Sequence, residues 1–178
     1  MATAFLDILG IGVLVPVLPF IIKDYGVGSE WVGYSMAIYS LGMFFGGLIF
    51  GRLSDKFGRR PMLVATTLFN FVGFLVIVYA PLFWIFLAGR FLGGLGGAGV
   101  GIVQAYVSDI STKENRTIRL GFIGAMFGLG FLIGPAIGGL LASFGNHFVG
   151  YAGAFFVFLN FLLVAFFLPE PKRHTPAE

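Results

Sequence analysis

Three polar side chains lie inside long apolar stretches of the sequence, where charged and amide groups are unusual. Asp7 lies in the stretch 3–22, and Arg90 and Gln104 lie in the stretch 82–107. A carboxyl group in apolar surroundings is either paired with another polar group or protonated. Asp7 is therefore a candidate proton carrier, and Arg90 and Gln104 are candidates for lining a polar cavity that holds protons or a substrate.

The composition places these side chains in a membrane protein. Of the 178 residues 58% are hydrophobic and 11% are charged, which is too few charged residues to cover a soluble domain. The chain has no cysteine, so it offers neither a disulfide nor a cysteine metal site. No cofactor and no metal site are expected.

Six stretches are long and apolar enough to span a bilayer as helices, which requires about 20 residues each. They are residues 3–22, 31–51, 62–80, 82–107, 119–143 and 150–168. The predicted fold is an all-α membrane protein, with one bundle over 1–168 and a cytoplasmic tail, or the start of a central loop, over 169–178. Residues 1–22 lack the basic start and the cleavage site of a signal peptide, so they are expected to remain as the first span.

The basic residues predict how the bundle is oriented. Of the eleven lysines and arginines, nine follow the second, fourth and sixth spans and therefore lie on one side of the membrane. Lys23, after the first span, lies on the other side, and Arg90 lies inside a span. These nine are Arg52, Lys56, Arg59, Arg60, Lys113, Arg116, Arg119, Lys172 and Arg173. Because basic loops stay in the cytoplasm, both termini are predicted to be cytoplasmic, in a multi-pass protein of the bacterial inner membrane. The positive net charge then reflects topology, and nucleic acid is not an expected partner.

Polar and small residues of the fourth span predict one helical face. They are Arg90, Gly94, Gly97, Gly101, Gln104 and Ser108, at spacings of three and four. An arginine at the centre of a span costs about 2.5–3.5 kcal/mol, so Arg90 should face the bundle interior, a partner or a wet cavity. Two alternatives remain open: the Arg90 side chain extends to the outer interface, and Asp7 lies at the inner interface.

The fifth span contains a row of glycines four residues apart, next to a proline. The motif consists of Gly130, Gly134, Pro135, Gly138 and Gly139. Such a row predicts close packing with a neighbouring helix, and the proline predicts a kink. In the first span, Pro16 and Pro19 predict a break in the helix near its outer end.

Residues 39–58 resemble residues 127–145 at an offset of 88. The matching pairs are Leu41/Leu129, Gly42/Gly130, Gly46/Gly134, Ile49/Ile137, Gly51/Gly139 and Leu53/Leu141, followed after a one-residue gap by Phe57/Phe144 and Gly58/Gly145. The second and fifth spans run in opposite directions through the membrane. The bundle is therefore predicted to be two inverted three-helix repeats, about 1–80 and 82–168, an arrangement found in transporters; chance similarity between glycine-rich segments is the alternative.

The loop FGRLSDKFGRRPML, residues 50–63, contains one acid among four basic residues. It closely resembles the hallmark loop between helices 2 and 3 of the major facilitator superfamily, with Gly51, Asp55, Gly58, Arg59 and Arg60 at the motif positions. Four other stretches resemble this family in the same order along the chain. FLDILGIGVLVPVLP is similar to helix 1 of tetracycline-type drug/proton antiporters, RFLGGLGGA to the helix-4 motif, GFLIGPAIGG to the helix-5 antiporter signature, and LPEP to the end of helix 6.

The resemblance implies roles for individual residues. In this family the acid of the loop motif pairs with the motif arginine and with an acid that ends helix 4, which here are Asp55, Arg59 and Asp109. Together with Gly51, Gly58 and Arg60 they would form a latch at the cytoplasmic face that stabilises the outward-facing state. Topology alone would explain the basic residues of the loop, but it requires neither Asp55 nor the motif glycines.

The resemblance also implies a partner, because the family has twelve helices in two halves with the substrate between them. This chain corresponds to the N-terminal half. It is expected to be an isolated half, a half-size transporter that forms a parallel homodimer, or a chain that pairs with a separate second half. The leading hypothesis is a proton-coupled exporter of small lipophilic compounds in the lipid bilayer, and not an enzyme, since no catalytic motif is present. Uptake by symport and a structural or assembly module without transport are the alternatives.

Overall fold

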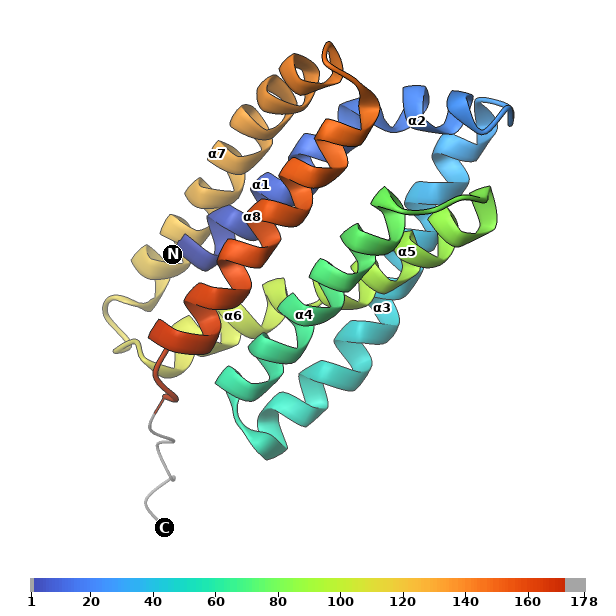
Figure 1. Cartoon of the computed structure of the whole chain (residues 1–178). Helices are drawn as coiled ribbons and strands as arrows, with labels where there is room; N and C mark the ends of the chain where they lie inside the picture. The colour runs from blue at the N-terminus through green and yellow to red at the C-terminus, as the bar shows by residue number, and fades with distance from the viewer. Residues whose placement is uncertain (1, 172–178) are drawn as a thin grey trace.

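Residues 2–171 are described by a computed structural model, which shows an elongated bundle of helices (Figure 1). Six helical segments are long and apolar enough to cross a membrane, and they coincide with the six predicted spans. They are Ala2–Asp24, Glu30–Phe57, Arg59–Val78, Phe83–Asp109, Arg116–Ala142 and Asn146–Phe167. The prediction of an all-α fold with six membrane helices is therefore confirmed. Most of the predicted tail, residues 172–178, lies outside the described residues.

Two of the six spans are interrupted. The first consists of α1 (Ala2–Leu14), the short 3-10 segment η1 (Val15–Val17) and α2 (Leu18–Asp24). Pro16 and Pro19 lie in the first turns of η1 and α2, where a residue without an N–H is tolerated, so the predicted break is confirmed. The fourth span divides at Ala98 into α5 (Phe83–Gly97) and α6 (Gly99–Asp109), which the sequence did not predict.

The other four spans are single helices: α3 (Glu30–Phe57), α4 (Arg59–Val78), α7 (Arg116–Ala142) and α8 (Asn146–Phe167). Helix α7 continues on both sides of Pro135. We call the end of the bundle at which α3, α6 and α8 finish the basic end, because seven of the basic residues predicted to be cytoplasmic lie there. These are Arg52, Lys56, Arg59, Arg60, Lys113, Arg116 and Arg119.

The two repeats exchange their first helices. Helix α1 packs against α7 and α8, whereas α5 packs against α3 and α4, and α4 also contacts α8 (Figure 1). The first span of each repeat thus lies on the second and third spans of the other repeat. This reciprocal packing is what two inverted three-helix repeats require, and it confirms that part of the predicted fold.

Matched glycines of the repeats make matching contacts. A Cβ on Gly46 of α3 would lie 2.5 Å from the carbonyl oxygen of Leu95 in α5, and a Cβ on Gly134 of α7 would lie 2.7 Å from the carbonyl carbon of Gly12 in α1. In both cases, only glycine permits the two backbones to approach so closely.

The turns that follow these helices also match. Gly58 joins α3 to α4 with φ 109° and ψ 157°, and Gly145 joins α7 to α8 with φ 132° and ψ 143°. Residues with a side chain rarely adopt this region of the backbone map. The same special conformation at two positions paired by sequence supports the repeat over a chance alignment of glycines.

Burial differs strongly between spans. In the most apolar window of each span, 56% of the residues of the first and 61% of the fourth are buried, but only 17% of those of α3 and of α7. The first and fourth spans are therefore the central helices of this bundle. In a bilayer, the outward faces of α3 and α7 contact lipid or another protein.

Candidate functional site

The Asp7 side chain points into the bundle and is only 3% exposed. Its Oδ1 accepts a hydrogen bond of 3.2 Å from Nδ2 of Asn70 in α4. Its Oδ2 lies beside the start of α6, since a Cβ on Gly99 would be 3.7 Å from this oxygen. The structure therefore places Asp7 between α1, α4 and the break in the fourth span, and not at a solvent-exposed interface.

Two buried amides accompany Asp7 that the sequence analysis missed. Asn70 is 0% exposed and Asn160 is 1% exposed, and they come from α4 and α8, the third spans of the two repeats. Thr66, one turn from Asn70, is also fully buried. The available signal was an amide inside an otherwise apolar helix, since burying an amide without a hydrogen-bond partner costs about 2–7 kcal/mol.

Arg90 is buried as well, with 4% of its surface exposed. Its guanidinium carbon lies 4.7 Å from the centre of the Tyr39 ring of α3, a cation–π distance. The alternative in which this side chain extends to the outer interface is therefore wrong. Arg90, Tyr39 and Asn70 line a small cavity between α1, α3, α4 and α5.

Gln104 does not share this cavity with Arg90. It is exposed, and it lines an open pocket of about 530 Å³ at the basic end together with Arg59, Ser108 and Arg116. Fourteen residues of helix separate Gln104 from Arg90 by about 21 Å. The two residues line different pockets, so the expectation of one cavity lined by both is not met. The regular spacing of the fourth span gave no sign of this distance or of the break at Ala98.

The structure brings the three residues of the expected latch together at the basic end. Arg59 Nη1 lies 2.6 Å from Asp55 Oδ1, and Arg59 Nε donates to Asp109 Oδ2 at 2.8 Å. Arg59 Nη1 also donates to Ser54 Oγ at 2.7 Å. One guanidinium thus joins the ends of α3 and α6 to the start of α4, with two charged partners. We call Asp55, Arg59 and Asp109 the charge cluster.

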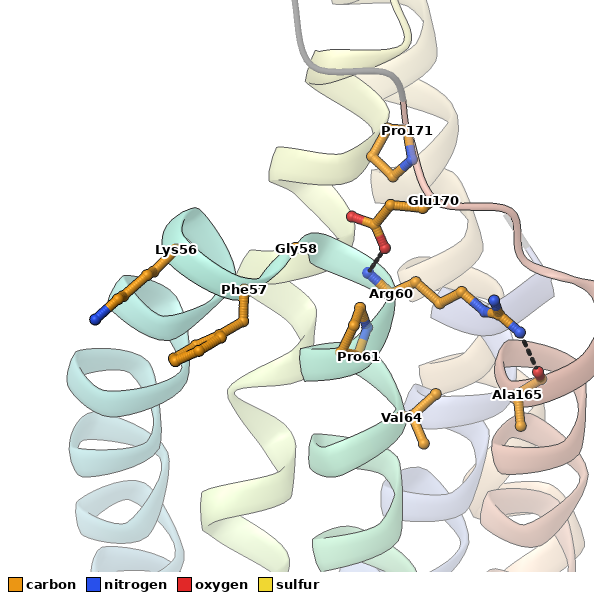
Figure 2. A pocket seen from close by; sticks show the side chains of 9 residues that line it. All are labelled: Lys56, Phe57, Gly58, Arg60, Pro61, Val64, Ala165, Glu170 and Pro171. Carbon is orange, nitrogen blue, oxygen red and sulfur yellow. Dashed lines mark hydrogen bonds between the residues drawn. The ribbon is translucent and has the colours of Figure 1, made fainter.

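Glu170 caps the start of helix α4, a role that the sequence did not indicate. Its carboxylate accepts a hydrogen bond of 2.7 Å from the backbone N–H of Arg59. It accepts another, of 3.0 Å, from the backbone N–H of Arg60 (Figure 2). These are the first residues of α4, whose free N–H groups and positive dipole end favour a carboxylate. The LPEP segment after α8 is thereby attached to the start of α4.

Two further hydrogen bonds hold this segment in place. Arg60 Nη2 donates to the carbonyl oxygen of Ala165 at 2.7 Å, as Figure 2 shows, and the Tyr106 hydroxyl donates to the carbonyl oxygen of Pro169 at 2.8 Å. An open hollow of about 850 Å³ lies beside these contacts. It is lined by Lys56, Phe57, Gly58, Arg60, Pro61, Val64, Ala165, Glu170 and Pro171.

The five residues of the helix-5 motif have different surroundings. Gly130, Gly134 and Gly138 lie against α1 and are buried. Pro135 is partly buried and lies near Gly12, whereas Gly139 has no other part of the described chain within 4 Å of a Cβ placed on it. The motif therefore forms the contact between α7 and α1, with Gly139 on the opposite face.

Comparison with known proteins identifies the family. Residues 1–178 match the sequence pattern of the Major Facilitator Superfamily. The chain belongs to this superfamily. Members of the superfamily are transporters and not enzymes, so the chain is an integral, multi-pass membrane protein of a transporter family.

Its superfamily relatives include drug-efflux proteins. The chain is 37% identical over 177 residues to the tetracycline resistance protein, class C, of Escherichia coli, covering 97% of this chain and 44% of the relative. It is 35% identical over 172 residues to multidrug resistance protein 1 of Bacillus subtilis, covering 96% of this chain and 44% of the relative. The chain thus spans less than half the length of these relatives.

Solved structures show the same fold. The chain superposes on the human organic anion transporter MFSD10 (TETRAN) with a TM-score of 0.85 and 25% identity, covering 97% of this chain and 47% of that one. It superposes on a D-xylose-proton symporter with a TM-score of 0.78 and 17% identity, covering 96% and 47%. The bundle thus has the architecture of about half of a major facilitator transporter.

Proposed function

We propose that the chain is one half of a proton-coupled transporter that exports small lipophilic compounds. The observation that carries this proposal is the carboxyl group of Asp7 in α1, which is buried and hydrogen-bonded to the amide of Asn70 in α4. The similarity to tetracycline and multidrug resistance proteins supports export of lipophilic cargo.

The amide of Asn70 suits a carboxyl group that gains and loses a proton. The Asn70 Nδ2 group donates to Oδ1 of Asp7 in the observed arrangement, which suits the ionised carboxylate. A carboxamide also has an acceptor oxygen, so a flip of the amide group about its Cβ–Cγ bond lets the same residue accept a hydrogen bond from the protonated acid. Both states of Asp7 can therefore be satisfied without a counter-ion.

The charge cluster is proposed to act as a latch on the cytoplasmic side. Arg59 holds the ends of three spans with two carboxylates, and Asp55 remains accessible, with 68% of its side chain exposed. In the working transporter this exposed acid would face a helix N-terminus of the second half and stabilise the outward-facing state. Protonation and latch release would then alternate during transport.

The second half of the transporter is proposed to cover α3 and α7, the two most exposed spans. Their apolar windows are only 17% buried, and the curated relatives are more than twice as long as the aligned segment. The occupant is a second copy of this chain in parallel orientation, or a separate six-helix chain. The mass of the protein in lipid nanodiscs distinguishes these from the alternative function: a strict monomer without a partner indicates an isolated half or an assembly module.

Transport in proteoliposomes tests the role of Asp7. The complete transporter, with whichever second half the mass measurement reveals, should move protons in exchange for a lipophilic dye. We expect Asp7→Asn to abolish this exchange, because asparagine cannot release a proton, while Glu30→Gln at the exposed start of α3 leaves it unchanged. Full proton-coupled exchange by Asp7→Asn would refute the proposal.

A further inference from the structure

A small cavity lies next to the Asp7–Asn70 pair, between α1, α3, α4 and α5. Its volume is about 10 Å³, which is room for one water molecule, because a buried water needs about 10–15 Å³ by this measure. Most of the wall is apolar, and three polar side chains complete it. The lining residues are Ile11, Leu14, Phe74, Ile77, Gly89, Gly93, Tyr39, Asn70 and Arg90.

All three of these polar side chains have an unsatisfied buried atom. Within the part of the chain that the structure describes, Asn70 Oδ1, Arg90 Nε and the Tyr39 hydroxyl have no hydrogen-bond partner. Each unsatisfied buried polar atom costs about 1–3 kcal/mol, and more when the group is charged. Asn70 Oδ1 is an acceptor, Arg90 Nε is a donor, and the Tyr39 hydroxyl can be either. None of the three is hydrogen-bonded to another, so a further polar group in the cavity would satisfy them.

The chemistry of Asn70 Oδ1 and Arg90 Nε restricts what this further group can be. An anion would accept from Arg90 Nε but would be repelled by the amide oxygen of Asn70, and a metal cation would be repelled by the guanidinium. A water molecule donates to Asn70 Oδ1 and accepts from Arg90 Nε, which gives it two of the two to four partners that buried waters have. The Tyr39 ring lies against the guanidinium and closes one side of the cavity.

We propose that this cavity binds one water molecule, which joins Asn70 Oδ1 to Arg90 Nε and completes a hydrogen-bonded chain from Asp7 to Arg90. The chain consists of Asp7, Asn70, the water and Arg90, and it runs from α1 through α4 to α5. Its consequence for transport rests on the proposed function: Asn70 is a positioning residue through which the protonation state of Asp7 reaches Arg90.

Gly93 provides a variant that fills the cavity without removing a polar group. A Cβ on Gly93 would lie 3.7 Å from Asn70 Oδ1 and 3.9 Å from Cε2 of Tyr39, which are ordinary van der Waals distances. Gly93→Ala should therefore fold normally and displace the water. Gly47→Ala in α3 is the matched control, because a Cβ there has nothing of the described chain within 4 Å and makes the same glycine-to-alanine change in a helix.

The water is detected at the Nε–H of Arg90. The chain, labelled with ¹⁵N-arginine, is placed in nanodiscs, and NMR measures magnetisation transfer from water to each of the seven arginine Nε–H groups, with Arg90→Lys assigning the signal. We expect transfer to Arg90 in the native chain and in Gly47→Ala, and its loss in Gly93→Ala. Absence of transfer in the native chain, or undiminished transfer in Gly93→Ala, would overturn the proposal.

This experiment separates the water site from the proposed function. Magnetisation transfer requires no transport, so a negative result for the water leaves the Asp7→Asn transport experiment intact, and the reverse is also true. If Gly93→Ala does not fold, the measurement on the native chain still decides whether a water contacts Arg90. Asn70→Leu, which removes the acceptor oxygen, then takes the place of Gly93→Ala as the variant that should lose the signal.

Discussion

Two glycines of the helix-5 motif, five residues apart on α7, should respond in opposite ways to substitution by alanine. A Cβ on Gly134 would lie 2.7 Å from the carbonyl carbon and 2.8 Å from the Cα of Gly12 in α1. Both are backbone atoms, so no side chain can rotate away. A Cβ on Gly139 has nothing of the described chain within 4 Å.

The size of the difference follows from these distances. Carbon atoms pack at about 3.5–4.0 Å, so Gly134→Ala must separate α1 from α7 locally by about 0.8 Å. Overpacking of this kind costs about 1–3 kcal/mol. Alanine gains about 0.5–1 kcal/mol over glycine in a helix interior, and this gain applies equally to both variants. We therefore expect Gly134→Ala to be less stable than Gly139→Ala by about 1–3 kcal/mol, about 5- to 140-fold in the unfolding equilibrium.

Unfolding by sodium dodecyl sulfate in mixed micelles, followed by circular dichroism, measures this difference. Gly130→Ala should fall between the two. Its Cβ would meet Ile8 Cγ2 at 2.8 Å, which can rotate away, while the fixed atoms Ile8 Cβ and Leu9 N lie at 3.0 and 3.2 Å, farther than the backbone atoms that Gly134 meets. If Gly134→Ala and Gly139→Ala unfold at the same detergent fraction, the motif is not the packing contact that the structure describes. A transport defect in Gly139→Ala at normal stability would instead indicate a contact with the second half.

Three other substitutions test the basic end. Glu170→Gln should lower the free energy of unfolding by about 0.5–2 kcal/mol, because an amide caps the two N–H groups of α4 less well than a carboxylate; an unchanged unfolding curve would contradict the cap. Gly58→Ala should cost about 1–3 kcal/mol through its φ of 109°, whereas Gly47→Ala in the same unfolding assay should not. Asp109→Asn should change stability by less than about 1 kcal/mol, since the Asp109 side chain is 40% exposed, but it should shift spin-label distances across the basic end in the complete transporter; identical distances would argue against a latch.

The sequence predicts the spans and the charge cluster because the signals there are local or periodic. Twenty apolar residues without a charge have few alternatives to a membrane helix, and all six spans are found within a few residues of their expected ends. Asp55 and Arg59 are close along the chain, on either side of the turn at Gly58. Asp109 is 50 residues away from Arg59, and only the resemblance to the major facilitator motifs implied its place in the charge cluster. The matched glycines that face a neighbouring helix reveal the repeat because they pack too closely for a side chain; they are Gly42 and Gly46 of α3 and Gly130 and Gly134 of α7.

The features that the sequence does not predict depend on distant contacts. Glu170 reaches the start of α4 across more than 100 residues, and no local pattern marks it. The break at Ala98 has no proline, so the regular spacing of the fourth span conceals it. Asn70 and Asn160 are each a single amide in an apolar span, without a repeating polar pattern around them. Only the folded chain shows that they lie near Asp7.

Because the repeats exchange their first helices, the buried residues Asp7 and Arg90 occupy equivalent spans of the two repeats. Asp7 is on the first span of one repeat and Arg90 on the first span of the other, and each of these spans packs against the second and third spans of the opposite repeat. In the proposed transporter, a change in the hydrogen bonds of Asp7 would act on α4, in its own repeat, through Asn70, and from there on Arg90, whose neighbour Tyr39 is also in the first repeat. A proton on Asp7 would then alter the packing of one repeat against the other, which is the movement that an inverted-repeat transporter requires.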